Sequence, residues 1–482
     1  MKALSFAEYE RLSDAGGLVP VFRELAGDLL TPVSAFRALG ARSERAFLLE
    51  SVLGGEQLAR YSFLGRDPVA TVEARGREVL EHANGQTRAL EGGLLAALRA
   101  RLPKSAAELP DLPRFTGGAV GHLTYDAVRL FEAIPDRHGA AAGLVASFSF
   151  YRSLVAFDHV RQRVVLIADA EPASRAAFER AQSVLDGLEA DLREGARAPG
   201  EGPRGPLGDA AFGDGADFRE AVARAKEYIA AGDIFQVVLS RQRTVECGLD
   251  PFTVYRALRM VNPSPYMYFL KEGATAIAGA SPEMLVRVEG RRVETRPIAG
   301  TRRRGESEAE DRRLGQELLA DEKERAEHIM LVDLGRNDLG RVCSFHSVSV
   351  PEFMKLERYS HVIHIVSSVV GELAGERDAL DALVATFPAG TLSGAPKIRA
   401  MEIIDELEPR PRGLYGGALG YLDLRGNLDF CIAIRTLIFR DGRATVQAGG
   451  GIVADSDPWA EQRETEAKAG ALVQALGLAG DL

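Results

Sequence analysis

The sequence predicts an α+β fold built on large, mostly antiparallel sheets. Two observations lead to this expectation. Short apolar or alternating runs, separated by turn residues, fill the first half of the 482-residue chain, and such runs are typical of strands. In the second half, strand-like and helical segments are mixed without the regular strand–helix–strand alternation that indicates a parallel sheet.

The first half, residues 15–193, is expected to consist of strands that end in one helix. Strands are predicted at AFLLESV (46–52), RYSFLG (60–65), GAVGHLTYD (118–126), SFSFYRSLVAFD (147–158) and RVVLIAD (163–169). The segment AFERAQSVLDGLEADLRE (177–194) has apolar residues at helical spacing. A stretch rich in Gly, Pro and Ala follows at 194–217, and we interpret it as a linker.

The second half, residues 218–480, is expected to begin with a helix at 218–233 and a strand at 234–246. Strands are predicted within TAIAGASPEMLVRVEGRRVETRP (275–297), and a helix is predicted at DEKERAEHIMLVDLG (321–335). This half therefore mixes helices and strands and contains most of the candidate functional residues.

Charge and cysteine content exclude several classes of protein. The formal net charge of −10 argues against a nucleic-acid or anionic-membrane partner. The charged N-terminus does not resemble a signal peptide, and apolar stretches such as 361–370 are too short to span a bilayer. The three cysteines show no metal-binding spacing and fit a reducing compartment, so we expect a cytoplasmic protein.

Two predicted helices each present carboxylates on one face. Glu324 and Glu327 are separated by three residues in the first, and Glu461, Glu464 and Lys468 share a face of the second. In the second helix, DPWAEQRETEAKAG begins with a capping Asp and a Pro at the first helical position. Four carboxylates are the hard oxygen ligands that Mg²⁺ requires, although a solvated helix face would explain either pair alone.

Glycine-rich segments are the second candidate feature. In VQAGGGIV (446–453) three consecutive glycines allow backbone N–H groups to approach an anion closely, although a bulge or tight turn is the alternative. The segment TLSGAPK (391–397) lies between two helix-like runs. Neither segment matches a P-loop or a dinucleotide-binding fingerprint. His364 lies in an apolar run, where a histidine buried in the core is the alternative to a catalytic one.

Together these strings resemble the chorismate-utilising enzymes. The resemblance covers Phe218 to Leu476, where ten motifs occur in the order of the family: GDIFQVVLS, NPSPYMYF, IAGASPE, RPIAGTRRRG, DEKERAEHIMLVDLGRND, TLSGAPK, GALGYLD, AIRT, QAGGGIVADSDP and EQRETEAKA. It implies a sandwich of two large, mostly antiparallel sheets with helices outside. It also implies that the N-terminal half interleaves with this core.

The resemblance implies roles for individual residues. Glu327 and Glu464 are expected to bind Mg²⁺ directly, with Glu324 and Glu461 acting through water, so that the metal neutralises the ring carboxylate of chorismate. The remaining candidates bind or react with the substrate. The ring carboxylate is expected to contact Gly449, Gly450, Gly451 and Lys468, and the enolpyruvyl carboxylate is expected to contact Tyr415 and Arg435. The ring pocket is expected to be lined by Gly300, Thr301 and Thr391, and Thr391 is also a candidate for catalysis. His364 is expected to transfer a proton.

Two positions distinguish the chemistries of the family. Gln236 lies where the water-adding members carry a basic lysine, and Ala299 lies where members that form a 4-amino product carry a nucleophilic lysine. The resemblance therefore implies addition of ammonia to C2 of chorismate and release of anthranilate and pyruvate, the committed step of tryptophan biosynthesis. The alternatives are the 4-amino product, aminodeoxychorismate, or a reaction that stops at 2-amino-2-deoxyisochorismate.

The source of ammonia is expected to be a second protein. The chain contains no region that resembles a glutamine amidotransferase and no cysteine in a nucleophile-elbow context. We therefore expect a separate glutamine amidotransferase subunit as the partner, corresponding to component II in this family.

Three further strings resemble the family's feedback site for L-tryptophan. They are LLES, which contains Leu49, Glu50 and Ser51, NPSPYM, which contains Pro265, Tyr266 and Met267, and LGY, which contains Leu419, Gly420 and Tyr421. Arg60, Tyr61 and Ser62 are expected near them. The alternative for NPSPYM is a rigid turn with two prolines.

Overall fold

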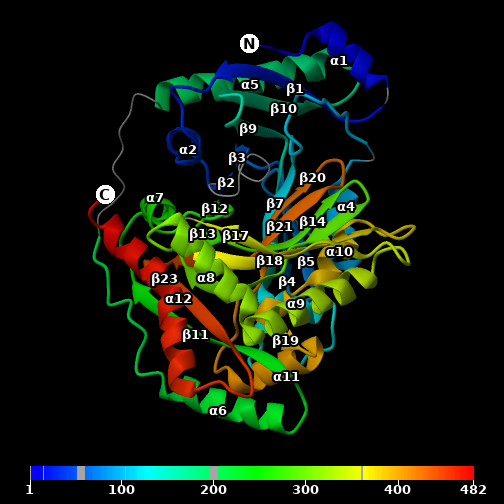
Figure 1. Ribbon diagram of the computed structural model, residues 1–482. Coiled ribbons are helices and arrows are strands. Elements are labelled where there is room, and N and C mark those ends of the chain that lie inside the picture. Colours follow the sequence, from blue (N-terminus) through cyan, green and yellow to red (C-terminus); the bar gives the residue numbers. More distant parts are fainter. Residues whose placement is uncertain (1, 15, 52–59, 104, 196–204, 360–361) are drawn as a thin grey trace.

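The computed structural model of this chain describes residues 2–14, 16–51, 60–103, 105–195, 205–359 and 362–482. Two large antiparallel sheets form a sandwich, and helices lie outside it (Figure 1). The predicted fold class is therefore confirmed. Among the described residues, no helix is long and apolar enough to cross a membrane.

The first sheet has 11 strands among the described residues, and every neighbouring pair is antiparallel. Its order is β1 (Val19–Ala26), β10 (Arg163–Ala170), β9 (Ser153–Asp158), β3 (Tyr61–Arg66), β2 (Arg45–Glu50), β12 (Tyr266–Glu272), β13 (Thr275–Ser281), β22 (Thr436–Arg440), β23 (Arg443–Ile452), β11 (Gln236–Glu246) and β19 (Gly394–Ala395).

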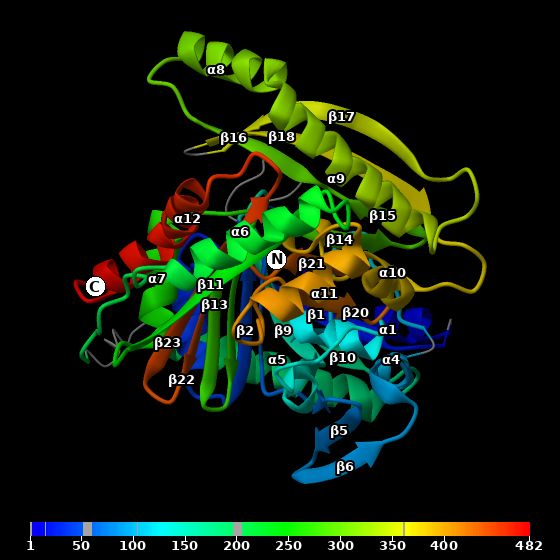
Figure 2. The ribbon, with the colours of Figure 1, turned by 90° about the horizontal axis from the view of Figure 1, so that it is seen from below.

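The second sheet has 12 strands among the described residues. Its order is β16 (Ile298–Arg303), β18 (Val362–Glu372), β15 (Arg292–Thr295), β14 (Met284–Glu289), β21 (Leu428–Ile432), β20 (Ala418–Asp423), β7 (Gly118–Leu123), β8 (Leu144–Tyr151), β4 (Ala70–Arg75), β5 (Glu78–Ala83) and β6 (Gln86–Leu90). Strand β17 (Ser349–Arg358) pairs with β18. Figure 2 shows β16, β17 and β18 together at one end of the molecule.

Helices surround the two sheets. They are α1 (Phe6–Ser13), α2 (Pro32–Gly40), α4 (Gly93–Arg101), α5 (Arg175–Gly195), α6 (Ala216–Ala230), α7 (Pro251–Val261), α8 (Glu308–Ala320), α9 (Glu322–Gly340), α10 (Ala379–Thr386), α11 (Lys397–Leu407) and α12 (Pro458–Ala479), with short 3₁₀ turns η1 (Tyr125–Leu130), η2 (Ala140–Ala142) and η3 (Gly390–Leu392). Helix α12 packs against β23 and α7, whereas α9 packs against β16 and β18.

The segment at 194–217 begins in the last turn of α5, which ends at Gly195, and reaches the start of α6 at Ala216. Residues 196–204 lie outside the described residues. The described remainder is attached to the end of β11, because the amide of Gly208 donates to the carbonyl of Glu246 at 2.8 Å. The amide of Gly248 donates in turn to the carbonyl of Pro206 at 2.8 Å.

The two halves of the chain meet along two pairs of neighbouring strands. The first sheet contains a block of five N-terminal strands, β1, β10, β9, β3 and β2, which joins the second half where β2 pairs with β12. The second sheet contains the block β7, β8, β4, β5 and β6, which joins the second half where β7 pairs with β20. We call the β2–β12 and β7–β20 pairs the two seams of the fold.

Candidate active site

Two capped helices carry the predicted metal ligands. The side chain of Asp321 accepts the amides of Lys323 and Glu324 at 3.1 and 3.2 Å, which fixes the start of α9. The side chain of Asp457 accepts the amide of Ala460 at 2.9 Å at the start of α12. The caps satisfy amides that have no partner inside the helix. Both caps thus set where the acidic faces begin.

The acidic faces of the two helices lie close together. Burial raises the pKa of Glu327, and the carboxylates of Glu324 on α9 and Glu464 on α12 raise it further. Burial also raises the pKa of Glu461, which is affected by Lys323 of α9 across the gap between the helices. The structure therefore brings together the four glutamates that the sequence only places on two separate helices.

Each carboxylate group has the chemistry of a Mg²⁺ ligand, but the four are not gathered around one point. Across the described parts of the chain, no group of three or more His, Cys, Asp or Glu side chains is arranged to hold a metal. Lys468 pairs with Glu464 at 2.7 Å, and Arg302 pairs with Glu324 at 2.9 Å. One oxygen of Glu461, Oε2, is buried and has no hydrogen-bond partner among the described residues. Hard oxygen donors and an unpartnered buried carboxylate oxygen fit a divalent cation.

The three glycines of β23 form the wall next to these carboxylates. A Cβ at Gly449 would lie 2.6 Å from the hydroxyl of Tyr415, and a Cβ at Gly450 would lie 3.1 Å from Oε2 of Glu461. A Cβ at Gly451 would lie 2.3 Å from Nε2 of Gln236. Gly449 is required because a Cβ there would also lie 2.5 Å from the backbone carbonyl of Leu239, and the lack of side chains at Gly450 and Gly451 leaves room for the side chains that approach the strand. The ammonium of Lys468 donates to the carbonyl of Gly449 at 3.1 Å, as expected for a neighbour of this strand.

Gln236 lies at the centre of the site. Gln236 begins β11, and its side chain hydrogen-bonds to the carboxylate of Glu327. This hydrogen bond lowers the pKa of Glu327 and so opposes the effect of burial. The other side-chain atom of Gln236, Oε1, is buried without a hydrogen-bond partner among the described residues. A neutral amide beside the predicted metal ligands is thus available to a polar ligand.

His364 is placed by the pairing of β18 with β16. Its Nδ1 lies 2.8 Å from the carbonyl of Gly300 and 3.2 Å from the hydroxyl of Thr301. Burial lowers the pKa of His364, so its ring is neutral at pH 7. Because a carbonyl only accepts, Nδ1 carries the proton and Nε2 remains able to accept one.

A buried carboxyl group that the sequence analysis gave no role lies on the other side of the site. Burial raises the pKa of Glu283 to about 8, and Thr391 donates a hydrogen bond to it at 3.1 Å. The cations of Arg435 and Lys468 oppose this rise, so both are close to Glu283. Glu283 is in the predicted motif IAGASPE, but only its burial distinguishes it from a surface glutamate.

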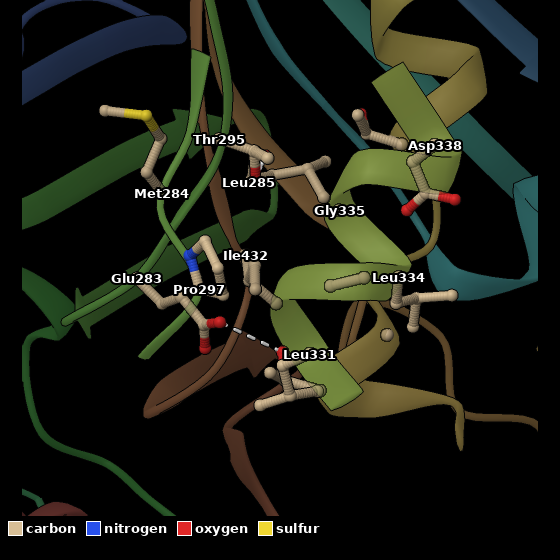
Figure 3. A pocket seen from close by; sticks show the side chains of 14 residues that line it. Glu283, Met284, Leu285, Thr295, Pro297, Leu331, Leu334, Gly335, Asp338 and Ile432 are labelled. Atoms are coloured by element: carbon tan, nitrogen blue, oxygen red, sulfur yellow. Dashed lines mark hydrogen bonds between the residues drawn. The ribbon is translucent and has the colours of Figure 1, made fainter. Parts of the chain in front are cut away.

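Glu283 and Thr391 line a pocket beside α9. Figure 3 shows Leu331 and Leu334 of α9 facing Glu283 and Pro297 across this pocket, with the hydrogen bond of Glu283 drawn as a dashed line. Its other lining residues are Met284, Leu285, Thr295, Gly335, Asp338, Thr386, Ala389, Gly390 and Ile432. A buried carboxyl group that is kept uncharged in the wall of a pocket is suited to donating a proton.

Tyr415 and Arg435 flank the hairpin formed by β20 and β21. The amide of Gly416 donates to the carbonyl of Ala433 at 2.9 Å, which joins the two ends of this hairpin. Tyr415 is buried and Arg435 is partly buried, and burial lowers the pKa of Arg435 while Glu283 opposes that change. The two predicted clamp residues therefore flank one site.

The residues of the predicted feedback site lie along the seams. Met267 on β12 pairs with Glu50 on β2, and Leu419 to Tyr421 form the part of β20 that pairs with β7. Met267 and Leu419 are buried in one apolar cluster, against which Leu49, Tyr266 and Tyr421 pack. Ser62 of β3 lies opposite Glu50. Residues 52–59, which follow Ser51, lie outside the described residues, and the roles of this set remain predictions.

The chain is similar to proteins of known family. A model of the chorismate binding enzyme family matches residues 44–474. Anthranilate synthase component 1 of Acetivibrio thermocellus is 47% identical over 479 residues, which cover 96% of each chain. The protein of the same name from Streptomyces coelicolor is 50% identical over 472 residues, or 95% of this chain and 89% of that one.

Solved structures share the fold. Anthranilate synthase component I from Streptococcus pneumoniae matches with a TM-score of 0.77 and 39% identity, over 94% of this chain and 99% of that one. MenF, the menaquinone-specific isochorismate synthase from Escherichia coli, matches over 97% of both chains with a TM-score of 0.70. At 19% identity, this second likeness concerns the fold alone.

Proposed function

This chain belongs to the family of chorismate-binding enzymes, and from that premise we propose that it catalyses the anthranilate synthase reaction, in which chorismate and ammonia yield anthranilate and pyruvate. The observation that carries this proposal is the neutral Gln236 hydrogen-bonded to Glu327 in the middle of the site. Ammonia is itself a nucleophile and needs no lysine to activate it. At the second position that distinguishes the chemistries of the family, Ala299 is buried in β16 and has no amine to attack the ring.

Mg²⁺ is the proposed cofactor. Glu327 and Glu464 would hold it, and Glu324 and Glu461 would act through water. When bound, the cation would neutralise the ring carboxylate of chorismate. The unpartnered Oε2 of Glu461 and the mutual repulsion that raises the pKa of Glu327 support a cation at this place.

The substrate is held at both of its carboxylates. Lys468 and the backbone of Gly449 to Gly451 would hold the ring carboxylate, and Arg435 with Tyr415 would bind the enolpyruvyl carboxylate. A planar guanidinium suits such bidentate binding. Gly300, Thr301 and Thr391 would line the ring between these two ends, which fixes the face of the ring that ammonia approaches.

Two proton transfers complete the reaction. As ammonia forms a bond to C2, both ring double bonds shift by one position and the C4–O bond breaks, and Glu283 donates the proton that lets the hydroxyl leave as water. Nε2 of His364 then accepts the proton from C2 while the C3–O bond breaks. Pyruvate leaves as its enolate, which takes up a proton from solvent after release, and the ring becomes aromatic. Thr391, which donates to Glu283, orients the acid.

A glutamine amidotransferase subunit is the proposed source of ammonia. The three cysteines of the chain are free and buried, and burial raises the pKa of Cys343 to about 11. Such thiols are poor nucleophiles. Free thiols also fit the cytoplasm as the proposed compartment.

L-Tryptophan is proposed as a feedback inhibitor that binds at the seams. The apolar cluster around Met267 and Leu419 would accept the indole ring, and the site is separate from the predicted metal ligands. Inhibition would then be allosteric, through a shift between two states of the enzyme.

Product identification tests the proposal. The purified chain with chorismate, Mg²⁺ and ammonium should release anthranilate and pyruvate in equal amounts, as measured by fluorescence and by a coupled pyruvate assay. Glutamine alone should support no synthesis until an amidotransferase subunit is added. A 4-amino product, isochorismate or accumulated 2-amino-2-deoxyisochorismate would contradict the proposal and favour a neighbouring activity of the family.

A further inference from the structure

A fully buried ion pair lies behind the candidate active site. Arg412 follows α11 in the segment that leads to β20, and its side chain is 1% exposed. Its Nε donates to Oε2 of Glu408 at 2.9 Å, and its Nη2 donates to Oε1 of Glu408 at 2.6 Å. The side chain of Glu408 is 6% exposed. Both charges are therefore paired away from solvent in a bidentate geometry.

The same guanidinium also holds two backbone segments of the site. Nη1 donates to the carbonyl of Leu392 at 2.6 Å, and Nη2 donates to the carbonyl of Val238 at 2.6 Å. Leu392 is the neighbour of Thr391 in η3, and Val238 lies two residues after Gln236 in β11. The guanidinium thus joins the segments that carry two residues with proposed roles in catalysis.

Two further segments are attached to the pair. Glu408 accepts the amide of Ser240 at 2.8 Å and its hydroxyl at 2.9 Å, and this hydroxyl accepts a hydrogen bond from Gln447 at 2.8 Å. Gln447 lies two residues before Gly449 in β23. The guanidinium carbon of Arg412 also lies 5.7 Å from the ring centre of Tyr415.

We propose that the Arg412–Glu408 pair is a positioning element for chorismate, which holds η3, β11, β23 and Tyr415 in the arrangement that binds the substrate. The inference rests on the proposed function. Only arginine can fill this place, because a planar fork of five donors reaches a carboxylate and two carbonyls in different directions at once. A lysine ammonium is a point charge at the end of a flexible chain and cannot span the three acceptors.

The pair is not explained by stability alone. Replacing a buried ion pair with apolar or neutral residues is often neutral for folding, whereas breaking it by removing one partner is strongly destabilising. The double variant Arg412→Met with Glu408→Gln leaves no unpaired charge and should fold. It nevertheless removes the donors that hold Leu392 and Val238.

The test compares this double variant with a matched control. Arg163→Met with Glu24→Gln removes a partly buried pair of the N-terminal block, far along the first sheet from the site. In the Arg412 and Glu408 double variant, we expect kcat/KM for chorismate to fall about 100-fold, the effect expected for a misplacement near 1 Å. KM for chorismate should rise, while the Mg²⁺ concentration for half-maximal activity should change much less, because among the described residues neither side chain of the pair hydrogen-bonds directly to α9 or α12. The control should keep both parameters.

A second variant guards against loss of folding. Ser240→Ala removes the hydroxyl that donates to Glu408 and accepts from Gln447, and it leaves the ion pair in place. It should fold and raise KM for chorismate severalfold, with a similarly small change in Mg²⁺ dependence. Wild-type KM for chorismate in both variants would overturn the inference, and so would an equal loss in the control pair. Failure of the proposed function is distinguishable, since it would appear as no turnover of chorismate by the unmutated chain.

Discussion

The candidate active site and the seams differ in which parts of the chain build them. Every predicted metal ligand and substrate contact lies in the second half, on elements from β11 to α12. The predicted feedback residues, in contrast, lie on both sides of a seam, with β2 from the first half pairing with β12 from the second. A ligand at the seams therefore contacts both halves, whereas chorismate would contact only one.

The polar groups of the two regions also differ in how well they are paired. In the active site, Oε1 of Gln236 and Oε2 of Glu461 are buried with no hydrogen-bond partner among the described residues. At the seams, Glu50 accepts from Tyr255 at 2.5 Å and from Arg259 at 3.0 Å. An unpartnered buried polar atom costs about 1–3 kcal/mol, which a polar ligand can recover. Nδ1 of His122 on β7 is also buried without a partner among the described residues. The contrast therefore concerns the predicted ligand-binding residues: those of the active site leave polar atoms unpaired, whereas those at the seams offer mainly apolar contact.

Removing a predicted metal ligand should have the largest effect. Glu327→Gln or Glu464→Gln should lower kcat/KM at least about 1,000-fold, or ~4 kcal/mol of transition-state stabilisation. A thermal melt of Glu327→Gln without Mg²⁺ should be unchanged or higher, because the charge of Glu327 is disfavoured by burial and by its neighbours. Asp333→Asn, on the exposed side of α9, is the matched control. Wild-type activity at limiting Mg²⁺ would show that these carboxylates do not hold the metal.

Loss of the buried acid should come next. Glu283→Gln should lower kcat about 100-fold, at the lower end of general acid catalysis. Because the pKa of Glu283 is raised to about 8, the acid is protonated below that pH, and wild-type kcat should fall as the pH rises through 8. The variant should lack this decline. Persistence of the same decline in Glu283→Gln would assign it to another group.

The same shift affects stability. A carboxyl group whose folded-state pKa lies above its ordinary value of 4.5 favours folding most at low pH, and this contribution is lost as the pH rises from about 4.5 through 8. Melting temperatures of the wild type should therefore decline more over this range than those of Glu283→Gln.

A smaller and more selective effect is expected at His364. His364→Met should reduce chorismate consumption less than about tenfold but anthranilate release about 100-fold, because its proton acceptor acts in the second half of the reaction. The amino intermediate should accumulate and be detectable by mass spectrometry. Parallel loss of both steps would refute the role given to His364.

The smallest effect on uninhibited turnover is expected at the seams. Ser51→Ala or Met267→Leu should raise the inhibition constant for L-tryptophan about tenfold, or ~1.4 kcal/mol, and leave uninhibited kcat nearly unchanged. Leucine conserves the volume of the buried Met267 and should keep the fold. Met260→Leu, at an exposed position, provides the control. Calorimetry that detects no tryptophan binding to the wild type would remove the feedback site.

Local signals made part of this molecule predictable. Asp457 caps α12 as its sequence context indicates, and the i and i+3 spacing of the glutamates is a property of any helix. The approach of α9 to α12 was not predictable, because it depends on sheets that join residues far apart in the chain. Glu283 was missed for the same reason. Its raised pKa arises from burial, and its hydrogen-bond partner Thr391, which opposes that rise, lies 108 residues away, and the sequence around Glu283 shows neither.

The two seams can form only late in synthesis, because the strands that they join lie far apart in the chain. All ten strands of the N-terminal blocks leave the ribosome before β12 and β20, the strands that pair with β2 and β7 in the finished protein. At about 5–20 residues per second, the interval between Leu123 and Ala418 lasts roughly 15–60 s. During that time β7, whose six residues are all buried in the final fold, presents an unpaired edge. Because such an edge is a template for pairing with another chain, the half-made polypeptide is the species most prone to aggregate.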